Sequence, residues 1–500
     1  MKYFGSNKTL LTILSGVLYG LALNFVQFYL AWICLVPFFI AIQNYNKKQS
    51  FFSGALMGFT LFWASFYWMP QAIYVISKGN IIGAIGVALI VPLAFAAYFG
   101  LITMCFSFLK AKKILWINSI LMASLWSIGG YLLSVIFPGM PWFSLDMGNT
   151  ILDNIYAIQP AVFGGIYLLS FFVVLINYLF AHFIVQHKWK KIIVPASLVI
   201  IYLAIGYCIL FNFKRNVVNT GRTVSVAILS GNIPEDQKWN EETGNVLAKK
   251  LLDLNEEALN TKPDIVLWPE GIVPWSYNAN DDFIKAVLKS TTSQPDVCHL
   301  MGFKTIDKNN YVYNSAYCIL PNGNVPGRHD KHYLVALAEH PIGIFSSLFL
   351  KDNNDRDYFK VGKDNGVIPT KKVKVGVLIC SELFIPEATQ KCTQNGAEIL
   401  VSLSDDVLFA SAMGIVRYQF YKNRLRAVEA RKDIAASCNM GISGMINAAG
   451  EIVVANHQAE GYTQKVELHP NNILTMSYSF SIFVLYISII IILFFSFINL

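Results

Sequence analysis

Acidic residues and arginine are almost absent from the first half of this 500-residue chain. Before Glu235 only Asp146 and Asp153 carry a negative charge, and the first arginine is Arg215. The chain has no arginine-rich strip, so we expect no nucleic-acid partner despite a formal net charge of +8. Much of that charge comes from lysines in short loops between apolar runs, a pattern typical of membrane topology signals.

Patterns for metal or cofactor binding are also missing. The eight cysteines include no C-x-x-C pair and the eight histidines show no ligand spacing, so we expect no metal and no cofactor. Cys34, Cys105 and Cys208 lie in apolar runs, where a free thiol is usually a packing residue. Pairing stays open for four cysteines of the second half: Cys298, Cys318, Cys392 and Cys438.

Apolar residues are abundant, at 55% of the chain. A membrane-spanning helix needs roughly 20 of them in a row, and the chain offers about eight such stretches. They cover approximately residues 9–25, 27–43, 52–74, 81–108, 115–136, 159–186, 192–212 and 481–500. The first reads as a retained anchor because it has no small-x-small cleavage site and further spans follow. We therefore predict a polytopic helical domain over 1–213, a globular domain over 214–475 and a last span in 476–500.

The loop lysines predict the orientation of these spans. With the N-terminus in the cytoplasm, Lys78 is the one lysine in an outer loop, and the positive-inside rule favours that arrangement. Seven spans then place residues 214–475 outside the cytoplasm. The lysines of the inner loops are Lys2, Lys8, Lys47, Lys48, Lys110, Lys112, Lys113, Lys188, Lys190 and Lys191.

An outer loop at 137–149, FPGMPWFSLDMGN, is rich in aromatic residues. Such a loop is either a plain turn at the headgroup level or the lining of an access path for a lipid. Both readings stay open.

Residues 214–475 alternate strand-like and helix-like runs, which indicates α/β layers. We expect strands at 224–232, 264–270, 299–306, 311–320, 372–380, 397–406, 434–441 and 443–455. We expect helices at 241–259, 281–292, 386–396 and 416–432. The runs at 299–306 and 311–320, joined by a short polar turn, indicate an antiparallel hairpin.

Three polar residues stand out near the apolar runs. Cys380 follows the alternating strand KKVKVGVLIC, where α/β folds place reactive groups, although many free cysteines are simply buried. Glu270 ends DIVLWPE and suits a general base, or else it is a solvated loop acid. Lys331 is a surface lysine or a fixed cation for an oxyanion. A cation near Cys380 would lower the pKa of its thiol.

Taken together, the order Glu, Lys, Cys in the contexts WPE, K-x-x-L-V and VLICSE resembles the nitrilase, or carbon–nitrogen hydrolase, superfamily. Joined to the spans, it looks like the membrane-anchored apolipoprotein N-acyltransferase family. GNIPEDQKW (231–239), YNSA (313–316) and GMPWF (139–143) are similar to family motifs. The resemblance implies a nitrilase-like αββα sandwich carried on the helical bundle.

The resemblance also implies roles for individual residues. Glu270 would be the general base, Cys380 the nucleophile and Lys331 the oxyanion-stabilising cation. Glu339 matches a second family glutamate that assists them, and the backbone N–H of Ser381 would complete the oxyanion site. Two further residues match positions that the family uses near the substrate: Glu382 and Trp239.

The chain departs from the family pattern around this triad. Ala336-Leu337-Ala338-Glu339 replaces a Pro-Phe-Gly-Glu run, and Ser381 replaces a tyrosine. The run 404–409, SDDVLF, has Leu408 where a tryptophan is expected, and the last span lacks a charged lead-in. These changes leave the triad in place and affect the expected lid closure and substrate preference.

The implied activity is N-acylation of the N-terminal diacylglyceryl-cysteine of lipoproteins in the bacterial inner membrane. A phospholipid donates the acyl chain through a thioester on Cys380, with the globular domain on the periplasmic side. Two alternatives remain, a membrane-tethered amidase acting on small amides and a catalytically degenerate lipid or lipoprotein binder. The sequence does not determine the preferred acyl chain, the headgroup or the oligomeric state.

Overall fold

The computed structural model describes residues 7–77, 79–111, 114–137, 140, 144–216, 221–234, 237, 239–240, 242–336, 338–341 and 358–498. Several sequence features lie outside these residues. They are Lys2, Lys78, Lys112, Lys113 and Leu337, most of GMPWF, and Glu235, Asp236 and Lys238 of GNIPEDQKW.

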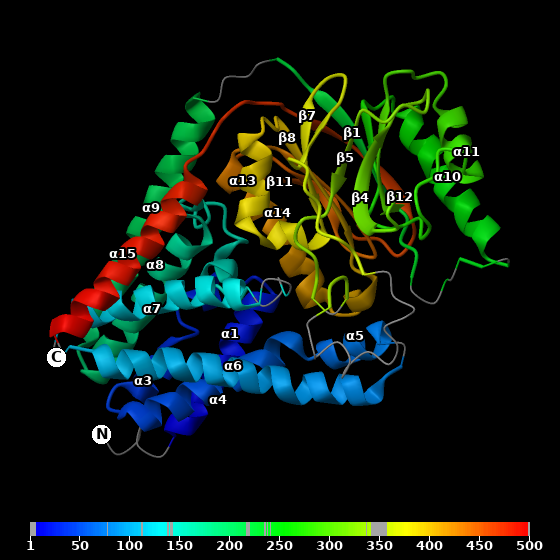
Figure 1. Ribbon diagram of the computed structural model, residues 1–500. Helices are drawn as coiled ribbons and strands as arrows, with labels where there is room; N and C mark the ends of the chain where they lie inside the picture. The colour runs from blue at the N-terminus through cyan, green and yellow to red at the C-terminus, as the bar shows by residue number, and fades with distance from the viewer. Residues whose placement is uncertain are drawn as a thin grey trace.

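An apolar helical region precedes the sheets and fills the lower left of Figure 1. Its helices are α1 (Lys8–Asn24), α2 (Phe28–Ala31), α3 (Val36–Ile42), α4 (Lys47–Phe66), α5 (Met69–Ile76), α6 (Ile81–Leu109), α7 (Leu115–Ile136), α8 (Ala161–Val185) and α9 (Ile193–Asn216). Two 3-10 helices, η2 (Met147–Ile151) and η3 (Trp189–Ile192), precede α8 and α9. The C-terminal α15 (Ser477–Ile498) returns to this region and packs on α7 and α8.

Among the described residues, four helices are long and apolar enough to cross a membrane: Ile81–Leu109, Leu115–Ile136, Ala161–Val185 and Trp189–Asn216. These coincide with four of the predicted spans. The first two predicted spans form shorter apolar helices, and 52–74 is divided between α4 and α5. The helical membrane region is thus confirmed, and the larger number of spans stays a prediction.

The described residues of the globular part form two six-stranded sheets. The first has the order β12-β1-β2-β3-β4-β5 and the second β11-β10-β9-β8-β7-β6. The first sheet is built from β1 (Val224–Ser230), β2 (Ile265–Leu267), β3 (Cys298–Ile306), β4 (Val312–Ile319), β5 (Gly327–Asp330) and β12 (Tyr462–Leu468). The second is built from β6 (Val367–Pro369), β7 (Lys374–Ile379), β8 (Ile399–Asp405), β9 (Ile434–Asn439), β10 (Ser443–Ile446) and β11 (Ile452–Asn456).

Helices cover both outer faces of the paired sheets (Figure 1). One apolar core lies between the sheets and another lies between the first sheet, α10 (Gly244–Asn260) and α11 (Asp282–Ser290). A third core is shared by α13 (Pro386–Gln394), α14 (Met413–Ala430) and the membrane helices. The order helix, sheet, sheet, helix agrees with the expected αββα sandwich.

The strand predictions are confirmed except at the sheet edges. The β3–β4 hairpin is antiparallel as predicted, with Gly302 opposite Ala316. The single strand predicted at 443–455 is wrong, because Asn447 and Gly450 form a turn that separates β10 from β11. The sequence reasoning also missed β5, β6 and β12. The first two are only four and three residues long, too short for an alternating pattern to be visible.

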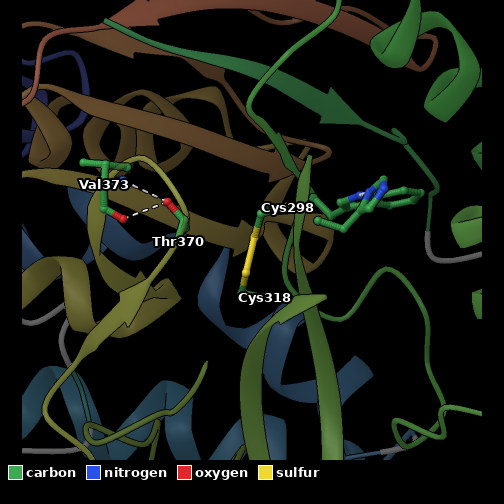
Figure 2. Close-up of a disulfide and its surroundings, with 6 residues drawn as sticks. Cys298, Cys318, Thr370 and Val373 are labelled. Carbon is green, nitrogen blue, oxygen red and sulfur yellow. Dashed lines mark hydrogen bonds between the residues drawn. A yellow bond between two sulfur atoms is a disulfide. The ribbon is translucent and has the colours of Figure 1, made fainter. Parts of the chain in front are cut away.

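A disulfide joins Cys298 of β3 to Cys318 of β4 in the core between the sheets (Figure 2). Cys392 and Cys438 are free and buried. The close-up also shows Thr370 and Val373, whose mutual hydrogen bonds close the turn from β6 to β7. The pairing left open by the sequence is therefore Cys298 with Cys318.

Helix α14 connects the globular part to the membrane helices through hydrogen bonds. Arg424 donates to the carbonyl oxygens of Leu152 (3.0 Å), Asp153 (2.5 Å) and Gly450 (2.6 Å). Lys422 donates to Asn149 Oδ1 at 2.7 Å. These two side chains are buried, so their carbonyl and amide acceptors replace lost water. Helix α14 therefore connects the loop that joins α7 to α8 with the turn between β10 and β11.

Candidate active site

Cys380 lies in a sharp turn between strand β7 and the 3-10 helix η5 (Cys380–Phe384). Its φ angle is +47°, in the left-handed region that a side chain rarely adopts. Such a conformation costs about 1–3 kcal/mol and persists where the surroundings hold it in place. The thiol is 8% exposed. A strained turn of this kind is where a nucleophile is often displayed.

Lys331, Glu270 and Glu339 meet in one charged cluster. Glu270 follows β2, while Lys331 follows β5 and is 1% exposed. Lys331 Nζ lies 2.8 Å from Glu339 Oε1 and 3.4 Å from Glu270 Oε1. The structure thus brings together two carboxylates and one lysine that are separated along the chain. Glu339 is further fixed by the backbone N–H of Val335, which donates to Oε2 at 2.8 Å.

Asn314 of β4 is a member of this cluster that sequence reasoning missed. Its Nδ2 donates to Glu270 Oε1 at 2.7 Å and to Glu339 Oε1 at 2.9 Å. Its carbonyl oxygen accepts from the Lys331 N–H at 2.8 Å. The YNSA run could have indicated Asn314, because its side-chain amide is not used by the strand and can bond to other side chains.

The charges in the cluster determine the protonation of Lys331. Burial by itself would lower the pKa of the ammonium group, but Glu270 and Glu339 outweigh burial and raise it. The lysine therefore stays protonated at neutral pH and offers a permanent positive charge.

The expected lowering of the Cys380 pKa is wrong for the resting protein. Burial raises the pKa of the thiol well above its usual value, and the nearby Glu270 carboxylate raises it further. Lys331 acts in the opposite direction without cancelling these effects. The resting group is a thiol, so a base must take its proton during the reaction.

Ser381 and Glu382 follow Cys380 and have structural partners. Ser381 Oγ donates to the carbonyl oxygen of Tyr333 at 2.6 Å, so its side chain ties η5 to the Lys331 segment. Its N–H lies in the first turn of η5, where amides have no acceptor within the helix. Glu382 is 1% exposed, bonds to His329 and accepts from the N–H groups of His332 and Ile379.

Trp239 lies in the segment that leads to α10. Its ring packs edge to face on Trp275, with centroids 5.1 Å apart, and Trp275 belongs to the loop after Glu270. Trp239 therefore neighbours the loop that carries Glu270 and packs against the core beneath α10 and α11.

Leu408, one of the positions that depart from the family pattern, lies near the membrane helices together with its neighbour Phe409. Leu408 packs against the core shared with these helices, and Phe409 lies against Trp68, with ring centroids 5.5 Å apart. In the Ala336–Glu339 run, Glu339 keeps its contact to Lys331. Leu408 therefore has a packing role at the junction of the two parts.

A cavity of about 270 Å³ lies between the membrane helices and the residues that follow Leu383. It is bounded by the end of α7, the start of α8 and the segment that follows η5. Its lining includes Ser134, Met140, Asp146, Tyr167, Tyr333, Phe384 and Glu387. The described part of the aromatic loop at 137–149 therefore borders a space between the membrane helices and the catalytic segment.

One group in the described residues has metal-ligand geometry: His329, His332 and Glu382 offer ligand atoms within 4.8 Å of one another. No local sequence pattern indicates it, because Glu382 is remote from the two histidines along the chain. The hydrogen bonds of these residues are all to each other, to carboxylates, to backbone groups or to Lys391.

Comparison with known proteins accounts for both parts of the chain. The family described as "Apolipoprotein N-acyltransferase N-terminal domain" matches residues 15–179, and the family "Carbon-nitrogen hydrolase" matches residues 225–476. The second match covers the two sheets, Glu270, Lys331 and Cys380.

Curated relatives match over nearly the whole chain. An apolipoprotein N-acyltransferase of Geobacter metallireducens is 27% identical over 470 residues, covering 89% of this chain and 86% of the relative. That of Haemophilus influenzae is 27% identical over 476 residues, covering 90% and 86%. Nit3 of Saccharomyces cerevisiae, a solved nitrilase-superfamily structure, is similar to 50% of this chain and 91% of its own, at 18% identity and a TM-score of 0.39. The chain belongs to the carbon–nitrogen hydrolase family, in the membrane-associated form that also carries the N-terminal domain of apolipoprotein N-acyltransferases.

Proposed function

We propose that this protein transfers an acyl chain from a phospholipid to the N-terminal amine of diacylglyceryl lipoproteins. The observation that carries the proposal is the cluster of Glu270, Lys331 and Cys380 in a domain joined to a family-specific membrane domain. Relatives named apolipoprotein N-acyltransferase match both halves, which supports an acyltransferase over a hydrolase.

In the first half-reaction, Glu270 takes the proton of the Cys380 thiol and the sulfur attacks the ester carbonyl carbon of a phospholipid. The carbonyl oxygen becomes an oxyanion, which the Lys331 ammonium and the Ser381 N–H stabilise. Loss of one such donor costs on the order of two to three decades in rate. When the oxyanion collapses, the ester C–O bond breaks, the leaving oxygen takes the proton from Glu270, and an S-acyl enzyme remains.

In the second half-reaction, the lipoprotein amine attacks the thioester carbonyl and Glu270 accepts the amine proton. The C–S bond breaks, the sulfur recovers a proton and the amide is released. Dividing one difficult transfer into two easier steps is the usual advantage of a covalent nucleophile. The burial of Cys380 keeps water away from the thioester.

The proposal includes about eight spans, a cytoplasmic N-terminus and a periplasmic catalytic domain in the bacterial inner membrane. Three lysine-bearing ends gather at one place, which supports a common side for them. Lys110 Nζ lies 3.4 Å from the Tyr45 carbonyl oxygen, Lys8 Nζ lies 4.3 Å from the Tyr45 ring centroid, and Lys47 Nζ lies 4.0 Å from the Phe108 ring centroid. The Cys298–Cys318 disulfide is also consistent with an oxidising compartment.

The experiment is intact-protein mass spectrometry of the full chain after incubation with phospholipid vesicles. The wild-type protein should gain one acyl mass on Cys380, and a diacylated lipopeptide should remove it. The Cys380→Ala variant should gain none, while Cys392→Ala, which removes another buried thiol, should behave like the wild type. Absence of an acyl adduct in the wild type, or release of ammonia from small amides instead, would contradict the transferase mechanism.

A further inference from the structure

His329 is buried between two carboxylates, two residues before Lys331. Its Nδ1 lies 2.6 Å from Asp364 Oδ1, and its Nε2 lies 2.9 Å from Glu382 Oε2. An ionised carboxylate only accepts hydrogen bonds, so each ring nitrogen must donate. A neutral ring would turn one lone pair toward a carboxylate. The geometry therefore corresponds to an imidazolium ion.

The two carboxylates also hold the backbone on both sides of Lys331. Asp364 Oδ2 accepts from the N–H of Asp330 at 2.8 Å, and Glu382 Oε1 accepts from the N–H of His332 at 2.7 Å. These are the residues immediately before and after the lysine. The backbone that carries the ammonium group is thus held at two points.

The same network reaches the nucleophile. Glu382 Oε2 accepts from the N–H of Ile379 at 2.9 Å, and Ile379 immediately precedes Cys380. Glu382 is therefore bonded to the neighbours of both Lys331 and Cys380, and His329 connects it to Asp364. Misplacing a catalytic group by about 1 Å can cost on the order of 100-fold in rate, so a rigid link between these segments matters for the reaction.

Two further titratable residues, His332 and Lys391, lie close to His329 and Asp364. The His332 ring lies 4.8 Å away between centroids, and its Nε2 is 3.4 Å from Asp364 Oδ2. Lys391 Nζ donates to the Asp364 carbonyl oxygen at 2.6 Å and lies 3.4 Å from His332 Nδ1. Burial would lower the pKa of His329, but Glu382 and Asp364 raise it to about 10. The ring remains charged at neutral pH.

A metal ion is the competing explanation for this group of side chains. His329, His332 and Glu382 could supply ligands, but both nitrogens of His329 already face carboxylates. A bound cation would have to displace the ring proton and would meet the Lys391 ammonium beside His332. The contacts therefore favour an ion-pair network without a metal.

We propose that His329 is a positioning residue for acyl transfer, a fixed imidazolium that holds the Lys331 and Cys380 segments in register through Asp364 and Glu382. This inference rests on the proposed function, because Lys331 and Cys380 have the catalytic roles given above. His329 itself does not touch the substrate.

The test compares His329→Gln with His469→Gln in the full-length protein. His469 also faces a carboxylate, Asp433, at 3.3 Å, but its side chain is 59% exposed and far from the site along the sheet. His329→Gln should reduce the single-turnover rate of Cys380 acylation 10- to 100-fold, with the phospholipid KM within about twofold. His469→Gln should leave both unchanged. A folded His329→Gln protein with the wild-type rate would overturn the proposal.

A second measurement does not depend on acyl transfer or on a folded variant. Nitrogen-15 resonances of the histidine rings, recorded on the wild-type protein at pH 8, should show one ring protonated on both nitrogens. A neutral His329 ring at that pH, or a stoichiometric metal found by elemental analysis, would overturn the proposal. If no thioester forms at all, the proposed function fails while this measurement still decides the charge of His329.

The pH dependence of stability gives a third readout with a definite sign. Because the pKa of His329 rises from 6.5 to about 10 on folding, its stabilisation is complete below pH 6.5 and lost as the pH rises toward 10. The pKa values of Asp364 and Glu382 are lowered, so their contribution is lost on acidification. The difference in thermal midpoint between wild type and His329→Gln should therefore be largest near pH 5 to 6.5 and shrink toward pH 10. A difference that is constant over this range would contradict the imidazolium.

Discussion

At the scale of single residues, Asn314 orients the two carboxylates that contact Lys331. Lys331 is attracted to both Glu270 and Glu339, and electrostatics by itself does not fix where each oxygen points. The Asn314 amide donates to one oxygen of each acid, which fixes their orientation. One oxygen of Glu270 is thereby engaged, and its other oxygen is the one suited to accept the thiol proton.

We predict that Asn314→Ala lowers the single-turnover rate of Cys380 acylation by on the order of 100-fold, because the base is no longer oriented. The phospholipid KM should change little. The control is Asn309→Ala, an exposed residue in the turn between β3 and β4. Equal rates for the two variants, with both folded, would show that Asn314 does not orient the base.

At the scale of elements, the β3–β4 hairpin carries Asn314 and is fastened by the Cys298–Cys318 disulfide. The two cysteines lie in the core between the sheets, 20 residues apart in the sequence. Closing a loop of that length restricts the unfolded chain. The hairpin that orients the site is therefore also one of the covalently fastened parts of the sandwich.

We predict that the double variant Cys298→Ala/Cys318→Ala loses about 2–4 kcal/mol of unfolding free energy. Peptide mapping without reductant should recover the linked pair from wild-type protein, and thermal unfolding in detergent should show the loss. Cys392→Ala, which removes a buried but free thiol, should lose less. Finding both Cys298 and Cys318 alkylated in unreduced protein would refute the linkage.

At the scale of the whole molecule, α14 and the loop before α8 form the junction between the two parts. Arg424 and Lys422 are buried there, although the charged residues in the sequence of α14 would suggest a helix exposed to water. Next to this junction lies the cavity of about 270 Å³, lined by Ser134 of α7 and by Phe384, the last residue of η5. Its position suits a lipid that approaches from within the bilayer.

We predict that Ser134→Trp raises the phospholipid KM by about tenfold, or about 1.4 kcal/mol, because the larger ring occupies part of the cavity through which the lipid would approach. Acylation assays with vesicles measure it. The matched control is Leu132→Trp, on the same helix but exposed and outside the cavity lining. If both variants keep the wild-type KM, the lipid reaches Cys380 by another route.

The sequence by itself determined the elements and the reactive residue types. Period-two alternation predicts β7 and places Cys380 at its end, and lysine-free apolar runs predict the membrane helices, because both signals depend on neighbours along the chain. The roles predicted for Glu270, Lys331 and Cys380 come from the resemblance of their local contexts to a known family. Short strands such as β6 could not be predicted, because they are too brief to show alternation. The turn at Asn447 is also too brief to stand out in the sequence.

Only the tertiary structure decided which groups meet. The bonds of Asn314 to two remote glutamates, and of His329 to Asp364 and Glu382, join segments from different strands and loops, and no local pattern encodes them. Burial reversed the expected effect on the Cys380 pKa, because desolvation depends on packing and not on sequence distance. Residue types thus specified the chemistry, and the packing of the two sheets on the membrane helices determined its geometry and charge.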